Sequence, residues 1–115
     1  METDCIFCRI AAGEASAAIV YHDDELTAFW DRRPAAPVHI LLIPNKHIDT
    51  LNQADDEDTH VLGRMILKAK EIAKKEGVDE RGFRLVINTG LEGGQSVNHV
   101  HLHLIAGKQL PIFHG

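Results

Sequence analysis

The 115-residue sequence contains few cysteines, few aromatic residues and no excess of basic residues. Its formal net charge of -5 argues against nonspecific binding to nucleic acid, because such binding usually requires a basic surface. Apolar runs such as residues 40–43 are far too short to cross a bilayer, and residues 1–4 are acidic where a secretory signal would be basic. We therefore expect a cytoplasmic protein with neither a nucleic-acid nor a membrane partner.

The only two cysteines, Cys5 and Cys8, are separated by two residues. A disulfide between them would close too short a loop to stabilise the fold, and disulfides are rare in reducing compartments. Two thiolates at this spacing can bind one zinc ion if two further ligands come from elsewhere in the chain. A metal site and a pair of free thiols both remain open on this evidence.

The sequence also lacks internal repeats, low-complexity tracts and linkers, so residues 1–115 are expected to form one domain. Hydrophobic periodicity predicts a short helix at residues 5–12 and a long helix at residues 55–76, which Gly77 is expected to cap. Strands are predicted at residues 19–22, 26–31, 38–43, 83–88 and 99–105. Strands grouped before and after one long helix favour an α+β fold with a mainly antiparallel sheet.

Three histidines at alternate positions, His99, His101 and His103, are the most informative feature of the chain. Successive side chains of a strand point to opposite faces, so the three imidazoles are predicted to share one face. Neither hydrophobicity nor strand propensity favours such a pattern. The histidines can form a polar face without a role, bind a catalytic metal, or supply a nucleophile with neighbouring proton carriers.

A glycine-rich loop at residues 89–96 precedes these histidines. Gly90, Gly93 and Gly94 permit backbone conformations in which several N–H groups point at one anion, and Gln95 and Ser96 add side-chain donors. A flexible hairpin loop would also use glycine. Next to the histidines, a phosphate-binding loop is the more economical interpretation.

The stretch at residues 93–104, GGQSVNHVHLHL, resembles the signature of the histidine triad superfamily. The similarity extends to residues 6–10, 28–31, 36–47, 86–88 and 106–110. The ending at residues 105–109 is most similar to the Hint branch, the purine nucleoside phosphoramidases, and the cysteine pair is typical of its bacterial-type members. The resemblance implies an α+β domain with a five-stranded sheet, one long and one short helix, and a homodimer that forms a continuous sheet.

The resemblance also implies an activity. Family members hydrolyse purine nucleoside 5′-phosphoramidates, or aminoacyl-adenylate-like mixed anhydrides, to the nucleoside monophosphate. The middle histidine, His101 in this sequence, would attack the α-phosphorus and form a nucleotidyl-histidine that water then hydrolyses. His103, His39 and Ser96 would complete the catalytic set. Without the resemblance, His39 would be interpreted as a solvent-facing residue of its strand.

Contacts to a bound nucleotide follow from the same resemblance. Asp31 would accept hydrogen bonds from the two ribose hydroxyls, since an ionised carboxylate only accepts, although it could equally cap the turn before Pro34. Phe29 and Ile10 would line the purine, although both residue types are more often core. The other expected contacts are Asn88, Gly94, Gln95, Ser96, His101 and His103.

For the metal, the resemblance implies a structural zinc ion bound by Cys5, Cys8, His47 and His99. One departure from the family concerns the C-terminal tail. Ile112 stands where the best-known Hint proteins carry a tryptophan that covers the leaving group, so the preferred leaving group stays open.

Other functions also stay open. A dinucleoside polyphosphate hydrolase would use the same triad with a different leaving group. A nucleotide-binding or protein-interaction module would contain a triad without catalytic activity. A catalytic metal at the triad would make turnover sensitive to chelation.

Overall fold

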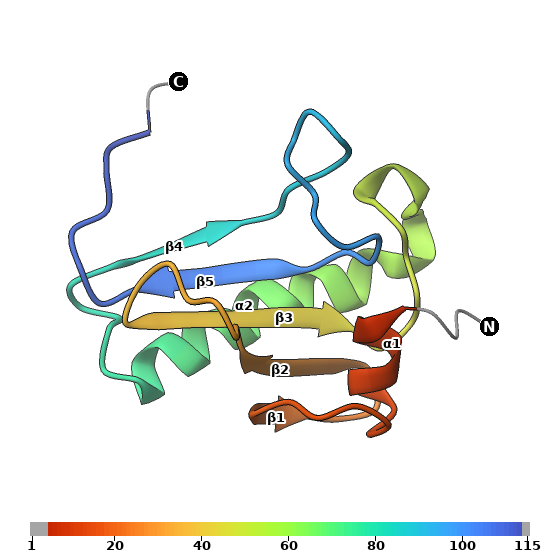
Figure 1. Cartoon of the computed structure of the whole chain (residues 1–115), viewed down its shortest axis with the longest axis horizontal. Helices are drawn as coiled ribbons and strands as arrows, with labels where there is room; N and C mark the ends of the chain where they lie inside the picture. The colour runs from red at the N-terminus through yellow and green to blue at the C-terminus, as the bar shows by residue number, and fades with distance from the viewer. Residues whose placement is uncertain (1–4, 114–115) are drawn as a thin grey trace.

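A five-stranded antiparallel sheet forms the centre of the computed structural model, which describes residues 5–113 (Figure 1). The strand order is β1-β2-β3-β5-β4, which places β1 and β4 at the two edges. The strands are β1 (Ile19–His22), β2 (Leu26–Trp30), β3 (Val38–Pro44), β4 (Phe83–Val86) and β5 (Leu102–Ala106). The predicted α+β class and antiparallel sheet are confirmed.

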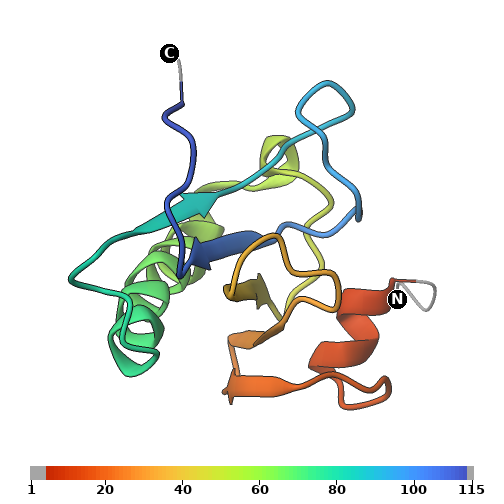
Figure 2. The same ribbon diagram turned by 60° about the vertical axis from the view of Figure 1, so that its left-hand side comes forward.

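Two α-helices pack on opposite faces of this sheet. Helix α2 (Thr59–Lys75) covers one face, and the short α1 (Ile6–Ala11) lies beside the end of β3 (Figures 1 and 2). Two short 3₁₀ helices, η1 (Leu51–Gln53) and η2 (Asp56–Asp58), precede α2. The predicted long helix therefore begins four residues later than residue 55, because η2 forms its expected first turn. Gly77, with φ of 76°, follows its end as predicted.

The two faces of the sheet divide the core into two clusters. In β3, Ile40 and Leu42 pack with α2, whereas Leu41 and Ile43 pack with α1. This alternation follows from the two-residue period of a strand, and both faces of β3 are buried. In β5, Leu102 belongs to the α2 cluster, so the histidines that alternate with it face α1.

The strand predicted at residues 99–105 is shorter than expected, as is the one predicted at residues 83–88. The backbone N–H of His99 donates to the carbonyl of Val97, and that of Val100 donates to Ile48, so neither joins the β4–β5 ladder. Strand β5 consequently begins at Leu102 and β4 ends at Val86. The three histidines nevertheless share the α1 face, since the rings of both His99 and His101 contact Phe7 of α1.

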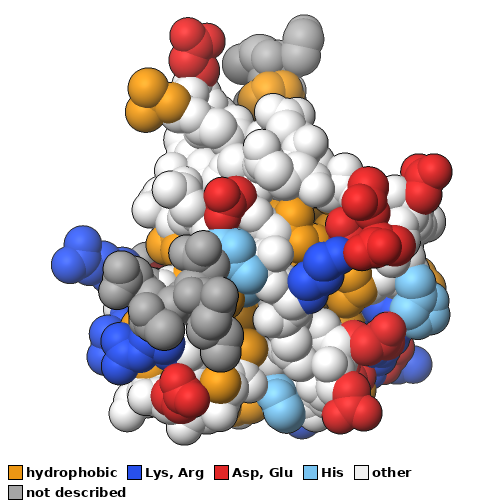
Figure 3. Space-filling model, turned by 90° about the vertical axis from the view of Figure 1, so that its right-hand side faces the viewer, with side chains coloured by type: hydrophobic (Ala, Val, Ile, Leu, Met, Phe, Trp, Pro, Cys, Tyr) orange, Lys and Arg blue, Asp and Glu red, His pale blue; other side chains and the backbone are white. Residues whose placement is uncertain are grey.

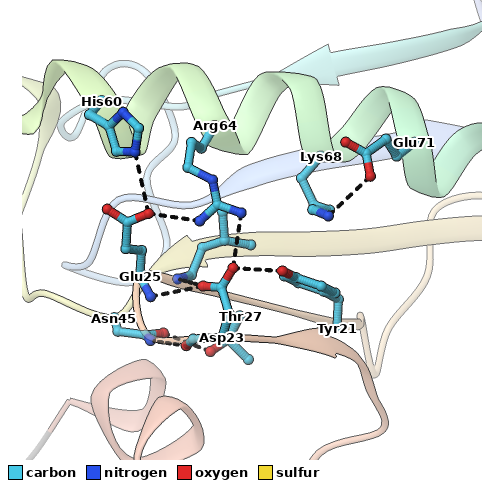
Figure 4. Close-up of polar contacts among 10 residues, drawn as sticks. Tyr21, Asp23, Glu25, Thr27, Asn45, His60, Arg64, Lys68 and Glu71 are labelled. Atoms are coloured by element: carbon cyan, nitrogen blue, oxygen red, sulfur yellow. Dashed lines mark hydrogen bonds and ion pairs between the residues drawn. The ribbon is translucent and has the colours of Figure 1, made fainter.

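An ion-pair network attaches α2 to the turn between β1 and β2 (Figure 4). The Arg64 guanidinium contacts Asp23 at 2.9 Å and Glu25 at 2.8 Å, and the Tyr21 hydroxyl donates to Asp23 at 2.6 Å. Burial alone would raise the pKa of Asp23, but the hydrogen bonds from Arg64 and Tyr21 lower it well below its usual value. The carboxylate therefore stays charged and holds the hairpin against the helix.

No helix within the described residues is both long enough and apolar enough to cross a membrane. The acidic residues 1–4, on which the expected cytoplasmic location partly rests, lie outside the described residues.

Candidate functional site

A cavity of about 290 Å³ opens between α1, the end of β2 and the loop before β5. Its apolar wall is formed by residues of α1 and by residues of β2 and β3 that pack against α1. Its polar wall is formed by His101, His103 and the turn after β2. Arg32 and Arg33 of that turn also line it. Six of the predicted site residues meet on its wall: Ile10, Phe29, Asp31, Ser96, His101 and His103.

His101 lines this cavity and is 3% exposed. Its Nδ1 is 2.8 Å from the backbone carbonyl of His99, and a carbonyl oxygen only accepts, so Nδ1 carries the proton. In the neutral form of the ring, the lone pair therefore lies on Nε2. The rings of Phe7 and His103 hold the imidazole in place, with centroids 5.1 and 5.0 Å away. This tautomer is the one that a nitrogen nucleophile needs.

His39 lies behind His103, outside the cavity wall. It is 5% exposed, so its interpretation as a solvent-facing residue is wrong. Its Nδ1 accepts a hydrogen bond from the Ala35 N–H at 2.9 Å, which leaves the proton on Nε2. That Nε2 lies 2.9 Å from His103 Nδ1 and 3.4 Å from a carboxylate oxygen of Asp31. His39 therefore donates to His103 and fixes its tautomer in turn.

The His103 ring is neutral at pH 7. Burial lowers its pKa to about 4, with further lowering by the neighbouring His101 and His39. Because Nδ1 of His103 accepts from His39, its Nε2 carries a proton. His103 thus presents an N–H donor beside His101, which suits the stabilisation of an anionic phosphate oxygen.

Asp31, Phe29 and Ile10 each have a structural role, and each also lines the cavity. One carboxylate oxygen of Asp31 accepts from the Arg33 N–H at 2.7 Å, which caps the turn, while the residue also lines the cavity. Phe29 and Ile10 belong to the buried α1 cluster and face the same cavity. A single apolar layer thus belongs both to the core and to the cavity wall.

The glycine loop projects from the sheet between β4 and β5 (Figure 1). Gly90 and Gly94 have positive φ angles of 74° and 79°, and a Cβ at Gly93 would lie 2.2 Å from the Thr89 carbonyl oxygen. The Asn88 amide donates to the Gly93 carbonyl at 2.8 Å. These positions therefore need glycine for the loop to close.

Gln95 holds the loop instead of lining the cavity. Its side-chain oxygen accepts from the Gly90 N–H at 2.9 Å, and its amide nitrogen donates to the carbonyls of Asp49 at 2.6 Å and Val97 at 2.9 Å. Among the expected phosphate contacts, Asn88, Gly94 and Gln95 thus lie off the cavity wall. Only Ser96 of this loop, with Val97 after it, reaches the wall.

A separate cluster of possible metal ligands contains Cys5, Cys8, His47 and His99. Cys5 Sγ lies 3.2 Å from His99 Nδ1, and Cys8 Sγ lies 3.2 Å from His47 Nδ1. All four candidate ligand atoms lie within 4.8 Å of one another. Two thiols and two imidazoles at this spacing fit the tetrahedral coordination of zinc.

The outer nitrogens of both histidines in this cluster have acceptors. His99 Nε2 donates to the Pro44 carbonyl at 2.8 Å, and His47 Nε2 donates to the Asp49 carboxylate. In the neutral tautomer that each of these bonds favours, Nδ1 carries the lone pair and lies next to the thiols, as a metal ligand must. Burial also lowers the pKa of His99 to about 4, which keeps the ring neutral.

Residues 12–110 match the family model described as the HIT domain. The chain belongs to the HIT domain family. A purine nucleoside phosphoramidase of Escherichia coli (strain K12) is 48% identical over 110 residues, which cover 96% of this chain and 92% of the relative. The predicted histidine triad membership is therefore confirmed.

Solved structures of HIT proteins agree with the fold. A histidine triad protein from Clostridium difficile has a TM-score of 0.95 and 44% identity, with 99% of each chain covered. A zinc-bound histidine triad family protein from Mycobacterium smegmatis has a TM-score of 0.80 and 28% identity, covering 94% of this chain and 78% of its own.

Several supporting residues of this HIT site are not evident from the sequence. The Ala35 N–H, the Pro44 carbonyl and the Val97 carbonyl act through their backbones, which no side-chain pattern reveals. Asp49 gives a weak signal, since a carboxylate two residues after a predicted histidine ligand can orient that ligand. The placement of Arg32 and Arg33 on the cavity wall depends on the turn that Asp31 caps.

Proposed function

We propose that this HIT protein hydrolyses purine nucleoside 5′-phosphoramidates, or aminoacyl-adenylate-like mixed anhydrides, to the nucleoside monophosphate. The observation that carries the proposal is the 2.8 Å hydrogen bond from His101 Nδ1 to the His99 carbonyl, because it selects the tautomer whose lone pair lies on Nε2, and His101 lines a cavity of about 290 Å³. The phosphoramidase relative, 48% identical, supports the same substrate class.

The cavity wall suggests how the nucleotide binds. The purine packs between Ile10 and Phe29, and the ribose hydroxyls donate to Asp31. The phosphate lies between His101 and Ser96, where the His103 N–H can donate to one of its oxygens. Gly94, Asn88 and Gln95 act on the phosphate through the shape of the loop that presents Ser96.

The reaction proceeds in two displacements at phosphorus. His101 Nε2 attacks, a bond from Nε2 to phosphorus forms, and the bond from phosphorus to the leaving nitrogen breaks as that nitrogen takes a proton from water. Water then attacks the nucleotidyl-histidine, the bond to Nε2 breaks, and one proton returns to solvent. The sum is one water consumed, one nucleoside monophosphate and one amine released.

Turnover of adenosine 5′-phosphoramidate tests this proposal. Wild-type protein should release AMP, and His101→Ala should lower kcat by several orders of magnitude while circular dichroism shows an unchanged fold. Diadenosine polyphosphate, assayed in parallel, should be a poorer substrate. Equal turnover by His101→Ala would overturn the nucleophile assignment, and faster cleavage of the polyphosphate would favour the other hydrolase class.

We also propose that Cys5, Cys8, His47 and His99 hold a structural zinc ion. The donor set fits this metal, and the zinc-bound HIT relative supports it. When bound, zinc would cross-link α1 to the segments after β3 and before β5. The triad itself is less suited to a catalytic metal, because His39 and His103 already bond to each other through the ring nitrogens that would face the ion.

For assembly we propose a cytoplasmic homodimer in which residues 1–115 act as one HIT domain. Strand β4 is an edge strand, so its outer backbone groups can pair with a second copy and extend the sheet. Ile66 and Leu67 of α2 are 49% and 58% exposed and offer further apolar surface for association. A pair of thiols close enough to bind one metal also suits a reducing compartment.

A further inference from the structure

Cys5 and Cys8, the only cysteines of the sequence, lie three residues apart at the start of α1. Their sulfur atoms lie within 4.8 Å of each other in the metal cluster. The Cys8 backbone N–H donates to Cys5 Sγ at 3.3 Å, so the Cys5 sulfur faces the first turn of α1, which contains Cys8. A disulfide needs the two sulfur atoms about 2.05 Å apart, a separation that rotation of the side chains can reach from this arrangement.

Cys5 is the more accessible thiol of the pair. Both cysteines are partly exposed, but Cys5 lines a cavity of about 370 Å³ together with His47, whereas Cys8 does not line it. Figure 3 views the molecule from the end where α1 lies, and a histidine side chain reaches the surface there. Because access decides which thiol reacts, a small oxidant meets Cys5 first and Cys8 is the second thiol.

His99 connects the thiol pair to the nucleotide cavity. Its ring Nδ1 lies 3.2 Å from Cys5 Sγ and 3.5 Å from Cys8 Sγ, whereas its backbone carbonyl accepts the 2.8 Å hydrogen bond from His101 Nδ1. Phe7 lies between the two cysteines in sequence, and its ring contacts the rings of both His99 and His101. A change at the sulfur atoms therefore reaches the cavity through His99 and α1.

We propose that Cys5 and Cys8 form a redox-sensitive modification site. A low-molecular-weight disulfide oxidises the pair to an internal disulfide, zinc is released, and the affinity of the cavity for nucleotide decreases. This inference rests on the proposed structural zinc, and it adds a control over the proposed hydrolysis.

The oxidation proceeds by two thiol–disulfide exchanges. Cys5 Sγ attacks one sulfur of glutathione disulfide, a bond between these two sulfurs forms, and one glutathione thiolate leaves. Cys8 Sγ then attacks Cys5 Sγ, the Cys5–Cys8 disulfide forms, and the second glutathione thiolate leaves. The cysteine pair loses two electrons and glutathione disulfide gains them. The chain then lacks both anionic ligands of the cluster, so the remaining histidines cannot hold zinc.

Titration of the zinc-loaded wild-type protein with glutathione disulfide tests the inference. Zinc release, intact mass, Tm and the Kd for AMP are measured at each oxidant concentration. We expect one zinc ion to be released for each internal disulfide, without a mass increase from bound glutathione. Tm should decrease, and the Kd for AMP should increase about threefold to tenfold, because the α1 side of the cavity is less preorganised. Excess reduced thiol with added zinc should restore both values.

Cys8→His is the matched variant. It offers a ring nitrogen to the metal in place of sulfur and removes the second thiol. Its oxidised form should therefore carry one bound glutathione and no internal disulfide, and zinc should be released only at higher oxidant concentrations. The Cys5→Ser and Cys8→Ser double substitution leaves no cysteine in the chain, so its Kd for AMP should be independent of glutathione disulfide.

The possible outcomes separate the redox site from the hydrolysis. Wild-type protein that keeps its zinc and both thiols in excess glutathione disulfide would overturn the inference. So would an internal disulfide that leaves the Kd for AMP unchanged, or glutathione bound to both cysteines without an internal disulfide. A reduced wild type that binds no zinc would overturn the proposed metal site and this inference with it. Reduced protein that binds AMP but releases none from the phosphoramidate would overturn the proposed hydrolysis and leave the redox site standing.

Discussion

The protonation of each histidine in the site is set by a backbone group or a neighbouring side chain. The His99 carbonyl fixes the proton of His101 on Nδ1, and the Ala35 N–H fixes that of His39 on Nε2. The same principle leaves Nδ1 of His47 and His99 free for the thiols. One residue type is thus proposed to supply a nucleophile, a donor and two metal ligands within one small region.

The pH dependence of stability tests the neutral state of His103. Its pKa is about 4 in the folded chain because of burial and the neighbouring His101 and His39, against 6.5 for a free side chain. Between these values the unfolded chain binds more protons, so the free energy of unfolding should decrease as pH falls from about 6.5 towards 4. His103→Gln should reduce the slope of Tm against pH in this window. An unchanged slope, measured by thermal denaturation at constant zinc loading, would contradict the assignment.

The four metal-cluster residues could be named from the resemblance to the histidine triad superfamily, and the structure brings them together. The anchoring of the loop by Gln95 could not, because it depends on carbonyls of Asp49 and Val97 brought together by folding.

Among the elements, the glycine loop controls where Ser96 lies. Gly93→Ala would place a Cβ 2.2 Å from the Thr89 carbonyl oxygen, so the backbone must shift. We expect kcat/KM for adenosine 5′-phosphoramidate to decrease roughly 10- to 100-fold, as misplacement of a substrate-positioning group does.

A second glycine provides the control for this change. An added Cβ at Gly63 of α2 would meet no atom within 4 Å. Gly63→Ala should leave kcat/KM unchanged and increase the free energy of unfolding by about 0.5–1 kcal/mol, since alanine favours helix. Wild-type kcat/KM in Gly93→Ala would contradict the positioning role of the loop.

The secondary structure elements could be predicted because hydrophobic periodicity is local, and their ends could not because they depend on distant partners. The strand predicted from residue 99 begins at Leu102, since the Val100 N–H donates to Ile48 instead of to β4. The helix predicted from residue 55 begins at Thr59, since Asp55 and Asp58 form a capping box around a 3₁₀ turn.

For the whole molecule, the metal cluster joins segments that are far apart in sequence. Cys8 belongs to α1 and Cys5 caps its N-terminus, whereas His47 and His99 lie after β3 and before β5. A zinc ion here would constrain the unfolded chain and hold the wall of the nucleotide cavity.

Removal of the metal should therefore affect stability more than chemistry. We expect that chelation, or the Cys5→Ser and Cys8→Ser double substitution, lowers Tm by roughly 10 °C or more, measured by calorimetry together with zinc content. AMP release should persist at temperatures below the lowered Tm. A protein that binds no zinc and has the same Tm with and without chelator would contradict the structural role, and complete loss of turnover in the folded, metal-free protein would indicate a catalytic metal.

The assembly makes a separate prediction. If β4 and α2 form the contact between two copies, Leu67→Glu should shift the protein from dimer towards monomer, because it places a charge on an exposed apolar position. Sedimentation over a range of concentrations measures this shift. A wild-type chain that stays monomeric at all concentrations would contradict the proposed dimer.

The most direct test of the account is the identity of the residue that becomes covalently nucleotidylated. Adenosine 5′-phosphoramidate is mixed with wild-type protein, the reaction is stopped by rapid denaturation under alkaline conditions, and the modified peptide is identified by mass spectrometry. The tautomer fixed by the His99 carbonyl predicts one AMP adduct, on His101, and none in His101→Ala. An adduct on a different residue, or undiminished AMP release by His101→Ala, would contradict it.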